Sequence, residues 1–241
     1  MSAPRIHVDG PLVVGERLLL PEGAARHVGL VLRRGAGEGV VVFDGRGREA
    51  TATIVEASRK RVEVVVEAEC APLAESPLTV HLGQAISKGE RMDFAIQKAV
   101  ELGVGVITPL YTERGDVRLK GERAERKLAH WRGVAISACE QCGRAVVPPI
   151  CAPQPLDEWL MARDEALRLV LHPGGHGADQ TERPGSAALL IGPEGGLSDA
   201  EIASARSHGF AALSLGPRIL RTETAPIVAL SILQYRFGDL G

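Results

Sequence analysis

The sequence has few aromatic residues and no long apolar run. Phe, Trp and Tyr make up 3% of its 241 residues, which leaves few platforms on which nucleic-acid bases could stack. No apolar run approaches the roughly 20 residues that cross a bilayer, and the first ten residues lack a signal-peptide core. We therefore expect a cytoplasmic protein without a membrane span. Any nucleic-acid recognition would rest on arginine, backbone and shape.

A large net charge is also lacking. The formal charge of -2 gives no overall electrostatic argument for a nucleic-acid partner. The basic residues are nearly all arginine, which suits phosphate better than lysine does. Nucleotide bias in the genome explains this composition equally well, and we favour that explanation.

Several familiar signatures are absent. No Walker A motif, no G-x-G-x-x-G after a strand, no H-E-x-x-H and no G-x-S-x-G occurs, which weakens the common nucleotide-binding and hydrolase interpretations. Cys139 and Cys142 form a C-x-x-C pair, but no second pair or histidines at ligand spacing follow. We expect no metal, and we interpret the cysteines as buried thiols in a reduced compartment rather than as zinc ligands or a redox pair.

Short strands separated by turns are typical of residues 17–69. The hydrophobic patterning predicts strands at 18–20, 40–43, 50–55 and 62–66, with a hairpin turn at Asp44-Gly45 and a short helix indicated by Ala24, Val28, Val31 and Leu32. This pattern favours a small β-barrel with one helix.

A proline-containing stretch at 70–77 predicts a linker between two domains, 1–72 and 73–241. Beyond it strands alternate with helices. The predicted strands are 78–82, 104–109, 167–171, 187–191 and 211–215, and the predicted helices are 90–102, 122–142, 199–208 and a last one ending at Phe237. This alternation predicts an α/β domain with a largely parallel sheet.

Two helix starts carry capping signals. Ser198 and Glu201 form a capping box, and Gly209 is placed to end that helix. Thr224 is positioned to cap the last helix, with Pro226 in its first turn. The apolar face expected for that helix consists of Val228, Ala229, Ile232 and Leu233.

Two glycine-proline turns follow predicted strands, at Gly192-Pro193 and at Gly216-Pro217. A third strand ends at Leu171-His172-Pro173. Ligands of open α/β sheets sit beyond the carboxyl ends of the strands, so the three loops are predicted to form one pocket. Its apolar members could line an adenine-sized slot.

The residues around these turns also resemble a known family. The motifs at 192–196 and 215–225 closely resemble the SPOUT methyltransferases, and within them the RsmE family of small-subunit rRNA uridine N3-methyltransferases. Further matches lie at 88–93, 97–103 and 140–144, and the N-terminal barrel is similar to the family's PUA-like domain. The resemblance covers nearly the whole chain.

The resemblance implies a C-terminal domain with a trefoil knot, an N-terminal PUA-like β-barrel, S-adenosylmethionine bound within the knot, and a homodimer acting on 16S rRNA of the small ribosomal subunit. General rules of topology would instead favour an unknotted sheet. By the same resemblance, the residues predicted to bind the cofactor are Leu171, His172, Pro173, Ile191, Gly192, Pro193, Glu194, Gly195, Gly196, Leu215, Gly216, Arg218, Ile219, Leu220, Thr222, Thr224 and Ala225.

Arg221, Arg144 and Glu223 are the candidate catalytic residues. An ion pair between Arg221 and Glu223 that only holds the loop is the alternative, while Arg221 could instead bind an RNA phosphate or the target base. The residues predicted to bind RNA are Arg5, Arg26, Arg33, Arg34 and Arg91. Acidic residues in the barrel roughly cancel its arginines, so a basic patch requires that folding separate the charges.

Methylation at uracil N3 requires that a weakly acidic proton leave, and therefore a base or a positive charge that stabilises the anion. We expect Arg221 or Arg144 to supply that charge, and the sequence identifies no proton acceptor. One alternative is a SPOUT enzyme that methylates ribose 2′-hydroxyls. Another is a non-catalytic RNA-binding factor in ribosome assembly.

Overall fold

The computed structural model describes residues 3–58, 61–172 and 183–241. The chain folds into two compact units. The first extends to Glu75 and also contains Ile136–Val147, and the second contains Ser76–Ala135 and Pro148–Gly241. Each unit is described by itself.

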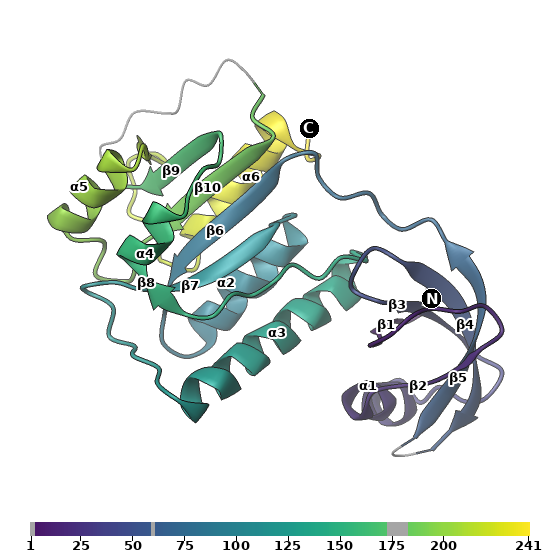
Figure 1. The fold of residues 1–241 in the computed structure, drawn as a ribbon. Helices are drawn as coiled ribbons and strands as arrows, with labels where there is room; N and C mark the ends of the chain where they lie inside the picture. The colour runs from purple at the N-terminus through teal and green to yellow at the C-terminus, as the bar shows by residue number, and fades with distance from the viewer. Residues whose placement is uncertain (1–2, 59–60, 173–182) are drawn as a thin grey trace. The chain divides into compact units, whose positions relative to one another are not determined.

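The first unit is built on a curled five-stranded sheet (Figure 1). Its strands are β1 (Arg5–His7), β2 (Arg17–Leu19), β3 (Gly39–Phe43), β4 (Glu49–Ala57) and β5 (Val62–Cys70), in the order β1-β3-β4-β5-β2. All pairings are antiparallel except that of β1 with β3. The hairpin predicted at Asp44-Gly45 is confirmed, since the Asp44 carboxylate accepts the amides of Arg46 and Arg48 and Gly45 has a φ of 72°.

Helical turns close one end of this sheet. α1 (Glu22–Arg26) continues into a π-helical turn, η1 (His27–Val31). Ala25 and Val28 are buried against the strands, as the helical spacing predicts. Val31 is 68% exposed, so the expected apolar stripe is shorter than the spacing indicates.

The second unit contains six parallel strands in the order β11-β9-β10-β6-β7-β8. These are β6 (Thr79–Ala85), β7 (Val106–Tyr111), β8 (Gln154–Pro155), β9 (Leu167–Leu171), β10 (Ser186–Ile191) and β11 (Ala211–Leu213). Every residue of β10 except Ser186 is buried, as expected for a central strand covered on both faces. The predicted parallel α/β domain is confirmed.

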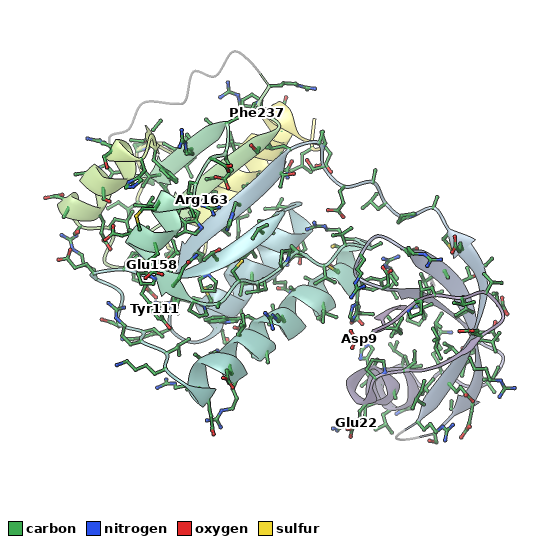
Figure 2. All side chains as sticks on the ribbon, in the orientation of Figure 1. Asp9, Glu22, Tyr111, Glu158, Arg163 and Phe237 are labelled. Atoms are coloured by element: carbon green, nitrogen blue, oxygen red, sulfur yellow. The ribbon has the colours of Figure 1, made fainter. Side chains whose placement is uncertain are left out.

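Helices cover both faces of this sheet (Figure 1). α2 (Glu90–Glu101) and α6 (Ala225–Phe237) pack on one face, and α4 (Leu156–Met161) and α5 (Asp199–Ser207) lie on the other. α3 (Glu122–Cys142) follows β7. Side chains fill the layers between sheet and helices (Figure 2). After the edge strand β11 the chain returns to α6, which packs against α2 and central β10. This path agrees with the knotted SPOUT arrangement.

The two predicted caps have different outcomes. The Ser198–Glu201 capping box is confirmed, with both reciprocal hydrogen bonds present. Thr224 occupies the N-cap position of α6, but its side chain makes no capping bond, so that prediction is wrong. Its φ and ψ of -83° and -34° are helical, whereas a capping side chain needs an extended backbone to reach the first amides.

The buried face of α6 also differs from the predicted one. Ala229 and Leu233 are buried as expected, whereas Ile232 is 39% exposed. Gln234 is fully buried on that face, donates a hydrogen bond to the carbonyl of Gly103 and accepts one from Ser76. α6 is thus anchored by a polar residue that an apolar pattern does not reveal.

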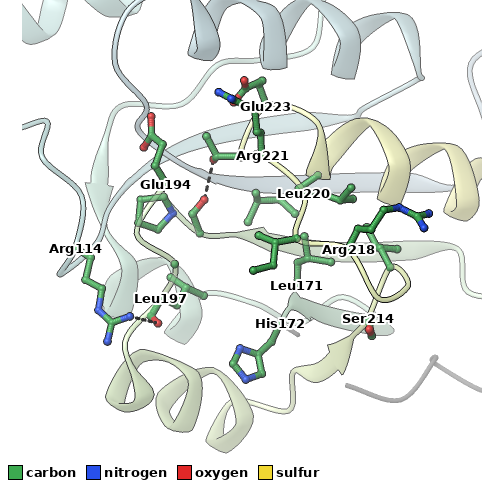
Figure 3. Close-up of a pocket in the computed structure, with 18 of the residues that line it drawn as sticks. Arg114, Leu171, His172, Glu194, Leu197, Ser214, Arg218, Leu220, Arg221 and Glu223 are labelled. Atoms are coloured by element: carbon green, nitrogen blue, oxygen red, sulfur yellow. Dashed lines mark hydrogen bonds between the residues drawn. The ribbon is translucent and has the colours of Figure 1, made fainter. Parts of the chain in front are cut away.

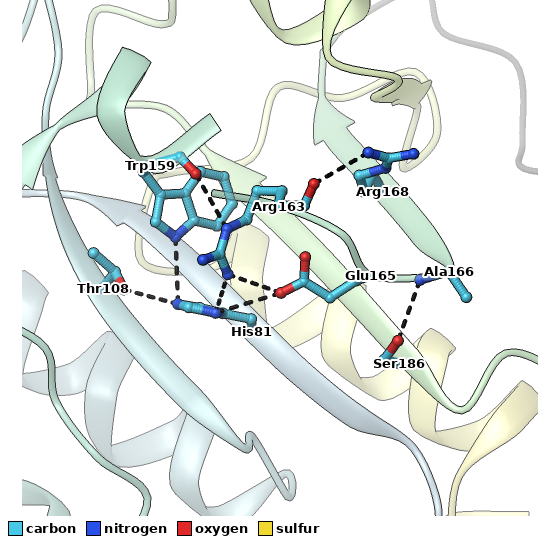
Figure 4. Close-up of polar contacts among 8 residues, drawn as sticks. All are labelled: His81, Thr108, Trp159, Arg163, Glu165, Ala166, Arg168 and Ser186. Atoms are coloured by element: carbon cyan, nitrogen blue, oxygen red, sulfur yellow. Dashed lines mark hydrogen bonds and ion pairs between the residues drawn. The ribbon is translucent and has the colours of Figure 1, made fainter. Parts of the chain in front are cut away.

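A partly buried polar cluster lies between β6 and the segment after α4 (Figure 4). The His81 Nε2 lies 2.8 Å from the Thr108 hydroxyl and accepts the Trp159 indole N–H at 3.3 Å. Arg163 contacts the His81 Nδ1 and donates to Glu165 at 2.8 Å. Burial, and then the nearby Arg163 charge, lower the pKa of His81 to about 3, so its imidazole is neutral in the folded protein at neutral pH.

The four cysteines are free, with Cys139 buried and the others half-buried. Burial raises the pKa of the Cys139 thiol to about 12, which agrees with the prediction of a buried thiol at that position, whereas Cys142 is only half-buried. In the part of the chain that the structure describes, no helix has the length and apolarity needed to span a membrane.

Candidate functional site

A cavity of about 910 Å³ lies in the second unit, beyond the carboxyl ends of β9 and β10 and along the segment between β11 and α6. All the described residues predicted to bind a cofactor line it except Gly195 and Thr224. Pro173 lies outside the described residues. The structure therefore brings the three predicted strand-end loops to one place.

A hydrogen bond joins the two glycine-proline loops that line the cavity, and Figure 3 marks it with a dashed line. The buried Thr222 hydroxyl donates to the carbonyl oxygen of Gly192 at 2.8 Å. The Gln84 side chain, at the end of β6, donates to the same hydroxyl at 3.1 Å. A buried hydrogen-bond chain thus fixes the spacing of two segments that are 30 residues apart.

The walls and rim suit different parts of S-adenosylmethionine. Leu171, Ile191 and Leu220 supply apolar surface, which fits an adenine ring. At Gly192 a Cβ would meet the Leu197 side chain at 3.0 Å and its backbone nitrogen at 3.1 Å, so glycine permits the tight turn. Charged groups of both signs at the rim match the ammonium and carboxylate of a methionine end.

The rim charges come from segments far apart in the chain. Arg91, near the start of α2, pairs with Glu194 at 2.9 Å. Arg114, in the loop after β7, donates to the carbonyl oxygens of Gly195 and Leu197 at 3.2 and 3.4 Å. Arg91, predicted to contact RNA, thus also borders the cavity and holds the Glu194 loop.

Five cavity residues were absent from the sequence-based prediction: Arg114, Leu197, Asp199, Ser214 and Pro217. Leu197, Ser214 and Pro217 lie next to predicted residues in the same loops, and Asp199 is the first residue of α5. Arg114 belongs to a different segment, after β7, and the rule that ligands sit at the carboxyl ends of parallel strands could have indicated it.

Arg221 and Glu223 both line the cavity. Arg221 is exposed, and no ion pair joins these two described side chains, so the alternative of a loop-holding pair has no support. The Glu223 Oε2 is buried and has no hydrogen-bond partner among the residues that the structure describes. A buried carboxylate oxygen without a donor is costly and is commonly found where a ligand or proton binds.

The remaining candidate residues belong to the first unit. Arg144 is buried, pairs with Glu75 and does not line the cavity. Arg5 pairs with Glu49, donates to the carbonyl oxygen of Arg144 at 3.1 Å and lies over the Phe43 ring. Each of these contacts joins residues of the first unit.

The barrel arginines differ in their contacts. Arg34 pairs with Glu38, whereas Arg26 and Arg33 are exposed. Among the described residues, no group of three or more His, Cys, Asp or Glu side chains is arranged to hold a metal ion.

Comparison with known proteins assigns the family. An RNA methyltransferase domain model matches residues 74–234, and an RNA methyltransferase PUA domain model matches residues 20–67. The ribosomal RNA small subunit methyltransferase E of Buchnera aphidicola is 37% identical over 98% of both chains.

Two solved structures are similar over 100% of both chains. A methyltransferase from Legionella pneumophila, in complex with bound SAM, has 46% identity and a TM-score of 0.96. A ribosomal RNA small subunit methyltransferase E from Neisseria gonorrhoeae, bound to S-adenosyl methionine, has 38% identity and a TM-score of 0.92. The chain belongs to the ribosomal RNA small subunit methyltransferase E family.

Proposed function

We propose that this protein methylates N3 of a uridine in 16S rRNA of the small ribosomal subunit, using S-adenosylmethionine. The observation that carries the proposal is the single cavity formed by both glycine-proline loops, locked by the Thr222–Gly192 hydrogen bond and bordered by Arg221 and Glu223. Family membership and the cofactor-bound relatives support the same activity.

The cofactor supplies a methyl group on a positively charged sulfur. The chain's own task is to align that group with the incoming nitrogen and to exclude water. The apolar wall of Leu171, Ile191 and Leu220 serves the second purpose. The Thr222 hydrogen bonds serve the first, because they hold the two loops in register.

Arg221 and Glu223 have complementary roles in this proposal. The uracil N3 proton must leave before or during attack. The unpartnered Glu223 Oε2 is suited to accept it, and the Arg221 guanidinium is suited to stabilise the negative charge that develops on the base. The target uridine must be unstacked, since N3 takes part in normal base pairing.

Methyl transfer to small subunits from a strain that lacks the modification tests these roles. We expect Arg221→Ala to lower kcat by about 10²- to 10³-fold, the usual loss when one donor to a developing anion is removed. Arg206→Ala, on the exposed part of α5, is the matched control and should retain full activity. Full activity in Arg221→Ala would rule out the charge role.

Calorimetry with S-adenosylmethionine separates this proposal from a non-catalytic assembly factor. We expect saturable binding with one site per chain. No measurable binding by well-folded protein would overturn the enzymatic function.

We further propose that the protein acts as a homodimer through α6. Ile232 and Tyr235, one helical turn apart, are 39% and 69% exposed on that helix, and such a pair is suited to bury apolar area against a second copy. Sedimentation velocity should give the dimer mass, and Tyr235→Asp should shift the protein toward monomer. A wild-type monomer at micromolar concentration would contradict this assignment.

A further inference from the structure

A second, smaller hollow of about 120 Å³ lies in the second unit. It is enclosed by the loop from β6 to α2, the segment before α3, and α3 itself. Its walls include Ile86, Val117 and Leu119, and its polar lining comes from Ser87, Lys88, Gly89, Arg123, Lys127 and Trp131. The volume suits one small group rather than a nucleoside.

Trp131 lines this hollow and carries a hydrogen-bond donor that is not used. Its side chain is 1% exposed, and its indole nitrogen has no acceptor among the described residues. The other tryptophan, Trp159, donates its indole N–H to His81. Since a buried donor without an acceptor is destabilising, the Trp131 N–H calls for an acceptor that the folded chain does not provide.

Three cations surround the hollow, and one of them has no acidic partner. Lys88 pairs with Asp116, and the Lys127 ammonium lies 3.9 Å from Asp93 and over the Trp131 ring. Arg123 is exposed and makes no ion pair with any residue that the structure describes. The three cations and their two acidic partners therefore carry a net positive charge, and the Arg123 guanidinium is available to bind an anion.

The backbone around the hollow adds donors. α2, a helix of 12 residues, begins directly after Gly89, and no side chain caps its first turn. Its first amides and its dipole favour an anion at this end, where Glu90 and Asp93 already lie in the first turn. A negatively charged acceptor could therefore accept hydrogen bonds from the Trp131 indole, the Arg123 guanidinium and the first amides of α2 at the same time.

The hollow lies beside the large cavity, because two chain segments border both. At the start of α2, Gly89 borders the hollow and Arg91 borders the cavity. After β7, Arg114 borders the cavity and Val117 borders the hollow. Three residues of chain span at most about 11 Å. A polymer with its reactive base in the cavity would thus bring a neighbouring backbone group to the hollow.

We propose that this hollow is a subsite for a phosphate of the RNA backbone near the target nucleotide. Arg123 binds the phosphate as a fork, and the Trp131 indole N–H donates to one of its oxygens. The RNA source rests on the proposed function, whereas the phosphate chemistry rests on the hollow alone.

NMR tests the phosphate chemistry without RNA. The chain has two tryptophans, so a proton–nitrogen spectrum shows two indole signals. We expect inorganic phosphate to shift the Trp131 signal saturably and to leave the hydrogen-bonded Trp159 signal in place, while chloride at equal ionic strength shifts neither. Arg123→Ala should weaken phosphate binding about tenfold, and Arg132→Ala, an exposed arginine of α3 outside both cavities, should not. A Trp131 signal that phosphate does not move would overturn the subsite.

Salt dependence of binding to small subunits tests the RNA source. Removing one phosphate contact should reduce the slope of log affinity against log salt by about 0.7 to 0.9, so Arg123→Ala should show this reduction and keep its affinity for S-adenosylmethionine. A phosphate-sensitive Trp131 with an unchanged salt slope in Arg123→Ala would overturn the RNA assignment. Failure of the proposed function gives a different result. The wild-type protein would then transfer no methyl group, while its Trp131 signal would still respond to phosphate.

Discussion

The Thr222 hydroxyl donates to the carbonyl oxygen of Gly192 at 2.8 Å and accepts a hydrogen bond from Gln84 at 3.1 Å. Three segments therefore meet at one buried oxygen: the end of β6, the loop after β10 and the loop before α6. The shape of the large cavity depends on this junction, because each loop forms one of its walls.

Replacement of Thr222 by valine keeps the side-chain shape and removes the hydroxyl. We expect Thr222→Val to lower the free energy of unfolding by about 1–3 kcal/mol, since two buried polar groups lose a partner. Affinity for S-adenosylmethionine should fall about tenfold or more as the loops separate. Urea denaturation and calorimetry measure both quantities.

Thr79→Val is the matched control, because Thr79 is exposed at the start of β6. It should leave both quantities nearly unchanged. Equal behaviour of the two variants would contradict the junction's role.

A methyl group at Gly192 should disturb the same loop by crowding. The added Cβ would lie 3.0 Å from the Leu197 side chain and 3.1 Å from its backbone nitrogen, and such overpacking typically costs about 1–3 kcal/mol. We expect Gly192→Ala to weaken cofactor binding, as measured by calorimetry.

The comparison variant is Gly133→Ala, in the middle of α3, where a Cβ meets nothing within 4 Å. It should stabilise the protein by up to about 1 kcal/mol, the usual helix-propensity gain. Undiminished cofactor affinity in Gly192→Ala would show that the turn tolerates a side chain.

The neutral His81 makes stability depend on pH. Its pKa is about 3 in the folded protein, against 6.5 for an unperturbed histidine, so below pH 6.5 the unfolded chain binds a proton that the folded chain does not. Stability is fully present above about pH 6.5 and is lost as the pH falls toward 3, with a slope of at most about 1.4 kcal/mol per pH unit from this group.

Urea unfolding of the wild type and His81→Gln at pH 7 and pH 5 measures this loss. We expect the wild type to lose more stability than the variant between the two values, because glutamine does not titrate. Equal losses of unfolding free energy in both proteins would contradict this account, because they would mean that the cluster of Figure 4 can open without destabilising the protein.

Helices and strands were predictable where the hydrophobic pattern was long or where a specific local motif, such as a capping box, was present. The strand 167–171 and the helix 122–142 agree with β9 and α3, and the Ser198 capping box formed as expected. β8 and α4 were missed, since two and six residues carry too few positions for a periodicity to show.

Most of the cavity was predictable because its residues follow strands whose carboxyl ends must meet at one edge of a parallel sheet. The contacts of single side chains were not. Arg144 pairs with Glu75, 69 residues earlier, and Thr222 bonds to Gly192, 30 residues earlier. Such partners are chosen by the tertiary fold, and no local pattern encodes them.

The most direct test of the central claim is the position of the methyl group on the product. Small subunits from a strain lacking the modification are incubated with the protein and isotopically labelled S-adenosylmethionine, and the digested 16S rRNA is analysed by mass spectrometry. The proposed function predicts one labelled uridine with the methyl group on N3 of the base. A methyl group on the ribose, with the base unmodified, would contradict it.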